Sequence, residues 1–107
     1  MGLEAGLELI RQREFFAAHE ELELAWRAAE PAERDFLHGL VHVAVAWYQA
    51  GRGRPVATTS QLEKGLRRLA PFEPEHRGVD VADLRRQLSE AHATVLSGSL
   101  DLPPPRV

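Results

Sequence analysis

Apolar residues recur with the spacing of an α-helix along nearly the whole chain. Leu3, Leu7 and Ile10 follow one another at intervals of four and three residues, which predicts a short first helix. After the polar residues 11–14, a second helix is predicted over about 15–29. No segment alternates between apolar and polar residues over a useful length, so the pattern predicts no β-sheet.

The third predicted helix is the most apolar part of the chain. It begins at Pro31, which suits the first turn of a helix because an N–H there has no helical partner, and it extends to about Ala50. Its apolar residues form two adjacent stripes: Phe36, Leu40, Val43 and Trp47, then Leu37, Val41, Ala44 and Tyr48. A helix that faces water on one side carries a single stripe, so we expect this helix to be central.

Two further helices are predicted in the second half of the chain. Pro55 opens a fourth helix, which Pro71 ends. A polar loop then extends to Gly78, and Asp80 has the chemistry of an N-cap for a fifth helix that reaches about Leu96.

Together these elements predict an all-α fold, a single-domain bundle of about five helices around the apolar third one. The 107 residues suffice for one modest hydrophobic core. We expect the helical domain to cover residues 1–97. Residues 98–107 contain three consecutive prolines and are expected to form a flexible, frayed tail.

Composition narrows the classes of function. The chain has no cysteine, which excludes disulfides, thiolate zinc sites and a cysteine nucleophile. A net charge of −3 provides no overall positive field for nucleic acid, and no apolar stretch is long enough to span a membrane. The N-terminus lacks the basic and apolar pattern of a signal peptide, so we expect a cytoplasmic protein.

Polar groups interrupt the packed face of the second helix. At about 100° per residue, His19 falls between Phe15 and Trp26, and Glu23 lies one turn further along the same side. Glu20 borders the same region. A buried face excludes an imidazole and carboxylates unless they are paired, so these groups need an explanation.

Two interpretations of this cluster stay open. In the first, His19, Glu20 and Glu23 form a buried polar network that fixes how two helices pack. In the second, they are catalytic candidates, with a glutamate as general base and His19 as acid or metal ligand. Residue type alone favours the structural network. The side chains expected to line a small pocket beside the cluster are Phe15, Trp26 and Tyr48.

The third helix could add metal ligands to the cluster. His38 and His42 also lie one turn apart, and a short connection would make the second and third helices antiparallel neighbours. With His19 and Glu23 they would form a four-ligand set suited to zinc or iron. These four residues stand at different heights along the two helices, so all four are not expected to bind one ion. Two or three of them could still surround a metal ion or a water molecule. In the alternative, both third-helix histidines are half solvated at the rim.

A second candidate site is the loop between the third and fourth helices. Arg52 and Arg54, next to the free N–H groups of a helix start, could hold a phosphate or a carboxylate. Alternatively, the loop is only a helix C-cap followed by a turn, with both arginines in solvent. Its glycines and its proline are sufficient to account for such a loop. This second interpretation is favoured.

Several of these residues together resemble the domain-of-unknown-function family 309. The resemblance covers about residues 8–70 and rests on Ala18-His19-Glu20, Leu22-Glu23, Trp26, Phe36-Leu37, Gly39-Leu40, Ala44, Tyr48 and Arg52-Gly53. It implies a small, cytoplasmic, all-helical protein. It also implies signature positions, without a role for them, at His19, Glu20, Glu23 and Trp26.

The chain departs from the pattern of that family at three positions. Glutamine is common in the family where His38 and His42 stand, and asparagine where Arg54 stands. A metal site that requires both third-helix histidines would therefore not be a property of the whole family.

The sequence thus favours a non-enzymatic helical module that binds a partner or assembles with itself. The apolar central helix suggests that part of the surface is buried in a homodimer. The alternative is a small metal-assisted hydrolase built on His19, Glu20 and Glu23, with a divalent zinc or iron ion as cofactor.

Overall fold

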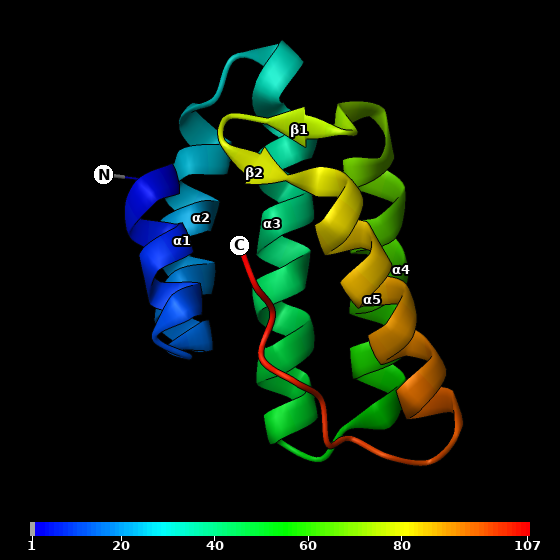
Figure 1. Cartoon of the computed structure of the whole chain (residues 1–107). Helices are drawn as coiled ribbons and strands as arrows, with labels where there is room; N and C mark the ends of the chain where they lie inside the picture. Colours follow the sequence, from blue (N-terminus) through cyan, green and yellow to red (C-terminus); the bar gives the residue numbers. More distant parts are fainter. Residues whose placement is uncertain (1) are drawn as a thin grey trace.

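Helix α3 (Pro31–Gly51) runs through the middle of the molecule, with α2 on one side and α4 on the other (Figure 1). The structure is a computed structural model that describes residues 2–107. Eleven of the 21 residues of α3 are buried, whereas only two of the 14 residues of α2 are. The prediction of a central third helix is therefore confirmed, because burial around most of a helix requires neighbours on several sides.

The other helices pack around α3 and confirm the all-α prediction. They are α1 (Leu3–Arg11), α2 (Phe15–Ala28), α4 (Pro55–Leu69) and α5 (Val81–Leu96). The Asp80 carboxylate accepts a hydrogen bond from the Asp83 N–H at 3.0 Å, as its predicted role as N-cap of α5 requires. Within residues 2–107, no helix combines the length and the apolar character needed to cross a membrane.

The loop between α4 and α5 contains more structure than the sequence predicts. A 3-10 turn η1 (Ala70–Phe72) precedes two antiparallel strands, β1 (Glu75–His76) and β2 (Val79–Asp80). The prediction of no β-sheet is therefore wrong for this small hairpin. Strands of two residues are too short to show an alternating pattern, and only Gly78, with a φ of +79°, indicates the turn.

Residues 98–107 are extended, as expected, but they lie along the bundle. The indole N–H of Trp47 donates to the Pro103 carbonyl at 3.0 Å. Gln87 and Arg106 exchange two hydrogen bonds of 3.0 and 2.8 Å between the Gln87 amide and the Arg106 backbone. These contacts differ from those of a frayed tail. Side chains of α3 and α5 supply hydrogen-bond partners that a tail without secondary structure lacks.

Two glycines let α3 and α4 approach each other closely. A Cβ atom at Gly39 would lie 2.7 Å from Cγ and Cδ2 of Leu69, which is fully buried. A Cβ atom at Gly65 would lie 3.6 Å from the Gly39 carbonyl oxygen. Close packing here sets the distance between the two helices.

We expect Gly39→Ala to lower the free energy of unfolding by about 1–2 kcal/mol. Overpacking against Leu69 costs roughly 1–3 kcal/mol, and the better helix propensity of alanine returns up to about 1 kcal/mol. Gly51→Ala, in the same helix with nothing within 4 Å of the new methyl group, is the matched control and should not destabilise. Urea unfolding of both variants measures the difference, and equal stabilities would contradict the expectation.

Candidate functional site

The predicted pair of His19 and Glu23 forms on α2, but it is only half-buried. His19 Nε2 lies 3.8 Å from Glu23 Oε2, and the two side chains are 26% and 34% exposed. Arg27 donates to the other oxygen of Glu23 at 3.3 Å, and Glu20 is exposed. The cluster is therefore not the buried network that the sequence predicts, because α2 turns this side partly towards water.

A small pocket lies beside His19 and has a volume of 150 Å³. Its lining residues are Phe16, His19, Val45, Tyr48 and Gln49. The ring of Phe16 lies 5.6 Å from the ring of His19 and 5.3 Å from that of Tyr48. Of the three residues expected to line the pocket, the structure places Tyr48 there. Phe16 contributes in place of Phe15, which packs against the core, and Trp26 lies elsewhere.

Trp26 stacks instead on His38 of α3, which in turn stacks on His42. The ring centroids of Trp26 and His38 are 4.3 Å apart with 22° between their planes. Those of His38 and His42 are 4.4 Å apart with 29° between their planes. We call these three stacked rings the aromatic ladder. The guanidinium of Arg34 covers Trp26 at 5.2 Å from the ring centroid.

The four predicted metal ligands are thus divided between two places. His19 and Glu23 form one pair, and His38 and His42 belong to the aromatic ladder. Across residues 2–107, no three His, Cys, Asp or Glu side chains are arranged so that they could hold one metal ion. The structure therefore does not assemble the four-ligand set.

His42 is the buried member of the ladder, with 8% of its surface exposed. Its Nδ1 lies 2.7 Å from Oε1 of Gln61 on α4, so the ring donates from this nitrogen. Burial lowers the pKa of His42 to about 4. Burial and the positive charge of Arg68 also lower the pKa of His38. Both imidazoles are therefore neutral at pH 7.

The loop after α3 has the form of a C-cap followed by a turn. The backbone N–H groups of Arg52, Gly53 and Arg54 donate to carbonyl oxygens at the end of α3. The Arg52 guanidinium donates to the Tyr48 hydroxyl at 2.9 Å and covers its ring. The N–H groups of this loop are therefore engaged with α3, and the geometry matches the favoured alternative to an anion site.

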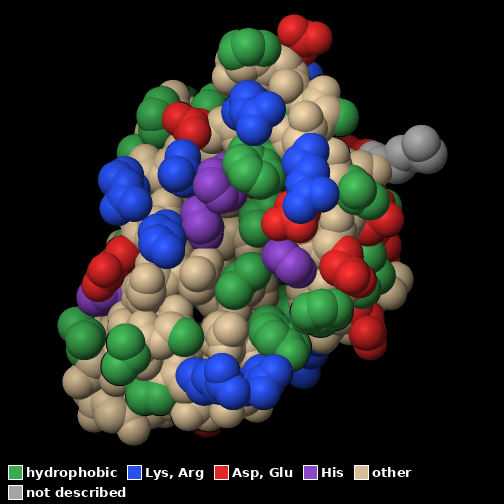
Figure 2. Space-filling view, turned by 180° about the vertical axis from the view of Figure 1, so that it is seen from behind, with side chains coloured by type: hydrophobic (Ala, Val, Ile, Leu, Met, Phe, Trp, Pro, Cys, Tyr) green, Lys and Arg blue, Asp and Glu red, His purple; other side chains and the backbone are tan. Residues whose placement is uncertain are grey.

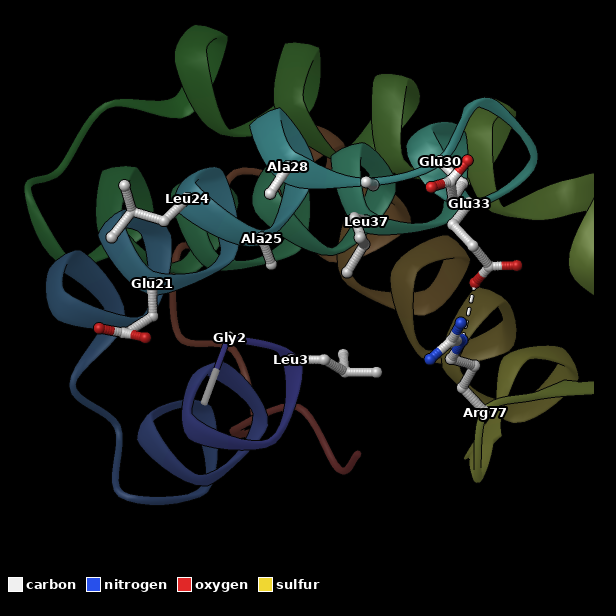
Figure 3. A pocket seen from close by; sticks show the side chains of 11 residues that line it. Gly2, Leu3, Glu21, Leu24, Ala25, Ala28, Glu30, Glu33, Leu37 and Arg77 are labelled. Carbon is white, nitrogen blue, oxygen red and sulfur yellow. Dashed lines mark hydrogen bonds and ion pairs between the residues drawn. The ribbon is translucent and has the colours of Figure 1, made fainter.

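A wide hollow lies on the other side of α2, where the sequence indicated no site (Figure 3). It has a volume of 650 Å³ and opens between the start of α1, the second half of α2, the start of α3 and the β-hairpin. We call it the α1–α2 groove. The apolar side chains that line it are Leu3, Leu24, Ala25, Ala28, Ala29 and Leu37.

Carboxylates stand along the rim of the α1–α2 groove. Glu33 accepts hydrogen bonds from His76 at 2.9 Å and from Arg77 at 2.8 Å, and the His76 bond is the main reason that the pKa of Glu33 is lowered. Glu21 and Glu30 also line the groove, Glu30 beside Glu33 and Glu21 at the other end (Figure 3), and neither forms a salt bridge among the described residues. The rim therefore carries three carboxylates, of which Glu33 alone forms salt bridges among the described residues.

One signal in the sequence points to this groove. Leu24 is a large apolar residue that helical periodicity places away from His19 and Trp26, beside Glu21 and Ala28. In the structure it is 60% exposed. A single exposed leucine is weak evidence for a binding site. The sequence also could not show the groove, because α1 and the hairpin that complete it are not adjacent to Leu24 in sequence.

The helices that carry these sites also carry a family signature. A model of the domain of unknown function DUF309 matches residues 3–60, more than half of the chain. The chain belongs to this family. The DUF309 match extends from α1 into α4 and includes the His19–Glu23 pair and the aromatic ladder, whereas the β-hairpin lies outside it. No curated protein and no solved structure matched the chain.

We expect His19→Ala to lower the free energy of unfolding by about 1 kcal/mol at most, because a half-exposed ion pair contributes roughly 0–1 kcal/mol. Leu22→Ala, at a fully buried position of the same helix, should cost about 2–5 kcal/mol. Urea unfolding measures both. A loss as large for His19→Ala as for Leu22→Ala would show that His19 is an essential packing element.

Acid should destabilise the protein through His42. The pKa of His42 falls from 6.5 to about 4 on folding, so its contribution is complete above pH 6.5 and is lost as the pH drops towards 4. The loss amounts to roughly 3 kcal/mol. His42→Gln keeps a neutral amide and should flatten this slope, whereas His92→Gln, outside the ladder, should retain it. Urea unfolding at several pH values between 7 and 4 measures how the free energy of unfolding changes with pH. If His42→Gln and the unchanged protein show the same dependence on pH, the expectation is contradicted.

Proposed function

We propose that this protein is a binding module that holds an amphipathic, positively charged helix of a partner protein in the α1–α2 groove. The observation that carries the proposal is an apolar groove of 650 Å³ whose rim bears three carboxylates, of which Glu21 and Glu30 form no salt bridge among the described residues. Helices that bind in grooves present apolar side chains at intervals of three and four residues. Apolar hollows with a polar rim are typical of such interaction sites.

The arrangement of charges favours a basic helix. Glu21 and Leu24 lie towards one end of the groove and Glu30 towards the other, with Ala28 and Leu37 between them (Figure 3). A helix whose apolar stripe is flanked by lysines or arginines could bury the stripe and place a cation near each carboxylate. Because the rim is open to water, these charges contribute mainly to the rate and specificity of binding, and the apolar contacts supply most of the affinity.

A second copy of the chain is the rival occupant. A two-fold contact through the same groove would set the acidic rim of one copy against that of the other, and each copy already carries a net charge of −3. This repulsion favours a basic partner over the homodimer that the sequence predicts. The predicted self-assembly would have to use another surface.

The test uses two synthetic helical peptides that share one apolar stripe, flanked by lysines in the first and by glutamates in the second. We expect the lysine peptide to bind in fluorescence anisotropy and the glutamate peptide to fail. Leu24→Gln should weaken binding about tenfold because it removes an apolar contact from the groove. Leu96→Gln, at a leucine that is 70% exposed outside the groove, is the matched control and should leave binding unchanged.

A charge reversal distinguishes the effect of a carboxylate at the groove rim from the effect of the net charge of the protein. Glu21→Lys should weaken binding of the lysine peptide about fivefold, while Glu20→Lys on the same helix changes net charge equally and should alter binding by less than about twofold. Equal effects, or no binding of the lysine peptide, would contradict the proposal. Light scattering distinguishes the rival: a dimer that Leu24→Gln dissociates would identify a second copy as the occupant.

A further inference from the structure

A second binding surface lies where residues 98–107 rest on the bundle. From the end of α5 these residues run back along α3 towards the β-hairpin (Figure 1). Trp47 of α3 and Gln87 of α5 hold them by hydrogen bonds, and these two side chains are only 6% and 7% exposed. We call this place the α3–α5 trough. Figure 2 shows the opposite face of the molecule, where histidine and basic side chains gather instead.

The trough binds the backbone of the tail at two points that are three residues apart. The indole N–H of Trp47 donates to the Pro103 carbonyl at 3.0 Å. The Gln87 amide donates to the Arg106 carbonyl at 3.0 Å and accepts from the Arg106 N–H at 2.8 Å. Consecutive prolines favour the extended polyproline II conformation, in which residues three apart face the same way. The spacing of the two contacts therefore suits a proline-rich segment.

Side chains of the tail add apolar contact and charge to these hydrogen bonds. Pro105 is buried, and Leu102 and Val107 pack against the hydrophobic core. A guanidinium nitrogen of Arg106 lies 4.0 Å from a carboxylate oxygen of Asp83 on α5. The trough thus combines an aromatic donor, an amide and a carboxylate, which together suit a segment of the form Pro-x-x-Arg.

The tail leaves space beside it in the trough. A hollow of 200 Å³ lies next to Pro103 and Arg106, against α5. Another, of 530 Å³, lies along residues 103–107 next to Arg11 and Arg13. Neither shares a lining residue with the α1–α2 groove. A ligand with the same backbone path and longer side chains could therefore make contacts that the tail does not.

We propose that the α3–α5 trough binds a proline-rich segment of a partner protein, of the form Pro-x-x-Arg, and that residues 102–107 occupy it as a built-in competitor. The chemistry of the partner follows from the tail, which has this form at Pro103 and Arg106. Proline-rich segments dock in aromatic-lined grooves in several families of binding domains, because their preformed conformation loses little entropy on binding. The inference is independent of the α1–α2 groove.

The tail can leave the trough while α5 stays capped. The N–H groups of Ser97, Gly98 and Ser99 donate to carbonyl oxygens in the last turn of α5, before the trough begins. Release of residues 102–107 does not break these bonds. While the tail is tethered, its effective concentration at the trough is on the order of millimolar, so a free ligand must compete with it. A change that weakens the tail should therefore strengthen binding of the ligand.

The probe is a fluorescent synthetic peptide with the sequence of residues 99–107, and its binding to the full chain is measured by fluorescence anisotropy. We expect Pro105→Ala, at a buried position of the tail, to bind the peptide at least about fivefold more tightly than the unchanged protein does. Pro104→Ala removes the same ring at an exposed position and is the matched control. It should change the affinity by less than about twofold.

Two further comparisons place the peptide in the trough. Added to Pro105→Ala, Gln87→Leu removes both hydrogen bonds to the peptide arginine and should weaken binding at least about tenfold. Gln49→Leu, at a half-buried glutamine of α3 outside the trough, should leave binding unchanged. A peptide methylated on the backbone nitrogen of its arginine lacks the N–H that Gln87 accepts and should also bind more weakly. This last comparison leaves the protein unaltered, so it does not depend on the folding of a variant.

Three outcomes would overturn the proposal. The first is no binding of the peptide to Pro105→Ala at millimolar concentration. The second is an equal loss for Gln87→Leu and Gln49→Leu, which would place the peptide elsewhere. The third is a dimer of the unchanged protein, detected by light scattering, that excess peptide dissociates. Such a dimer would identify the tail of a second copy, in place of a partner protein, as the occupant of the trough.

Discussion

The close contact between α3 and α4 is the constraint around which the other elements of the bundle are arranged. It requires residues without side chains at Gly39 and Gly65, and it places the buried Leu69 directly over α3. Because α4 covers one side of α3 at this short distance, α2 packs on another side, and α1 packs mainly against α2. The α1–α2 groove exists because α1 and the β-hairpin meet α2 and α3 from different directions and leave space between them.

Helical periodicity explains how α2 serves two surfaces of different chemistry. Residues three and four apart share a side, so Glu21, Leu24 and Ala28 face the groove while His19 and Trp26 face the ladder and the small pocket. Only two residues of α2 are buried, which leaves most of its circumference available for polar and aromatic groups. A helix of this kind contributes little to the core and much to the surface. The α1–α2 groove and the small pocket are therefore both lined in part by α2.

The sequence predicts the helices well because each signal is local. Apolar spacing, Pro31 and Asp80 fixed the helical segments to within about two residues of those observed. The burial of single polar residues depends instead on packing between distant segments. His19 was expected in a buried network, and one of two alternatives placed His42 half solvated at the rim, whereas His42 is the more buried of the two because Gly65 lets α4 come close to it. The hairpin and the placement of the tail depend in the same way on partners far along the chain.

The two histidines of α3 show why a residue can satisfy packing and still carry a separate chemical property. A neutral imidazole tolerates burial near Arg68 and Lys64, whereas a charged one is disfavoured both by desolvation and by those cations. Glutamine, which the family resemblance leads us to expect at both positions, could fill similar space and hydrogen-bond to Gln61, but it cannot take up a proton. Any proton-linked behaviour of the ladder would therefore distinguish this chain from DUF309 members that carry glutamine. The stacking of Trp26 on α3, in contrast, requires only a flat side chain at position 38 and could be common to both.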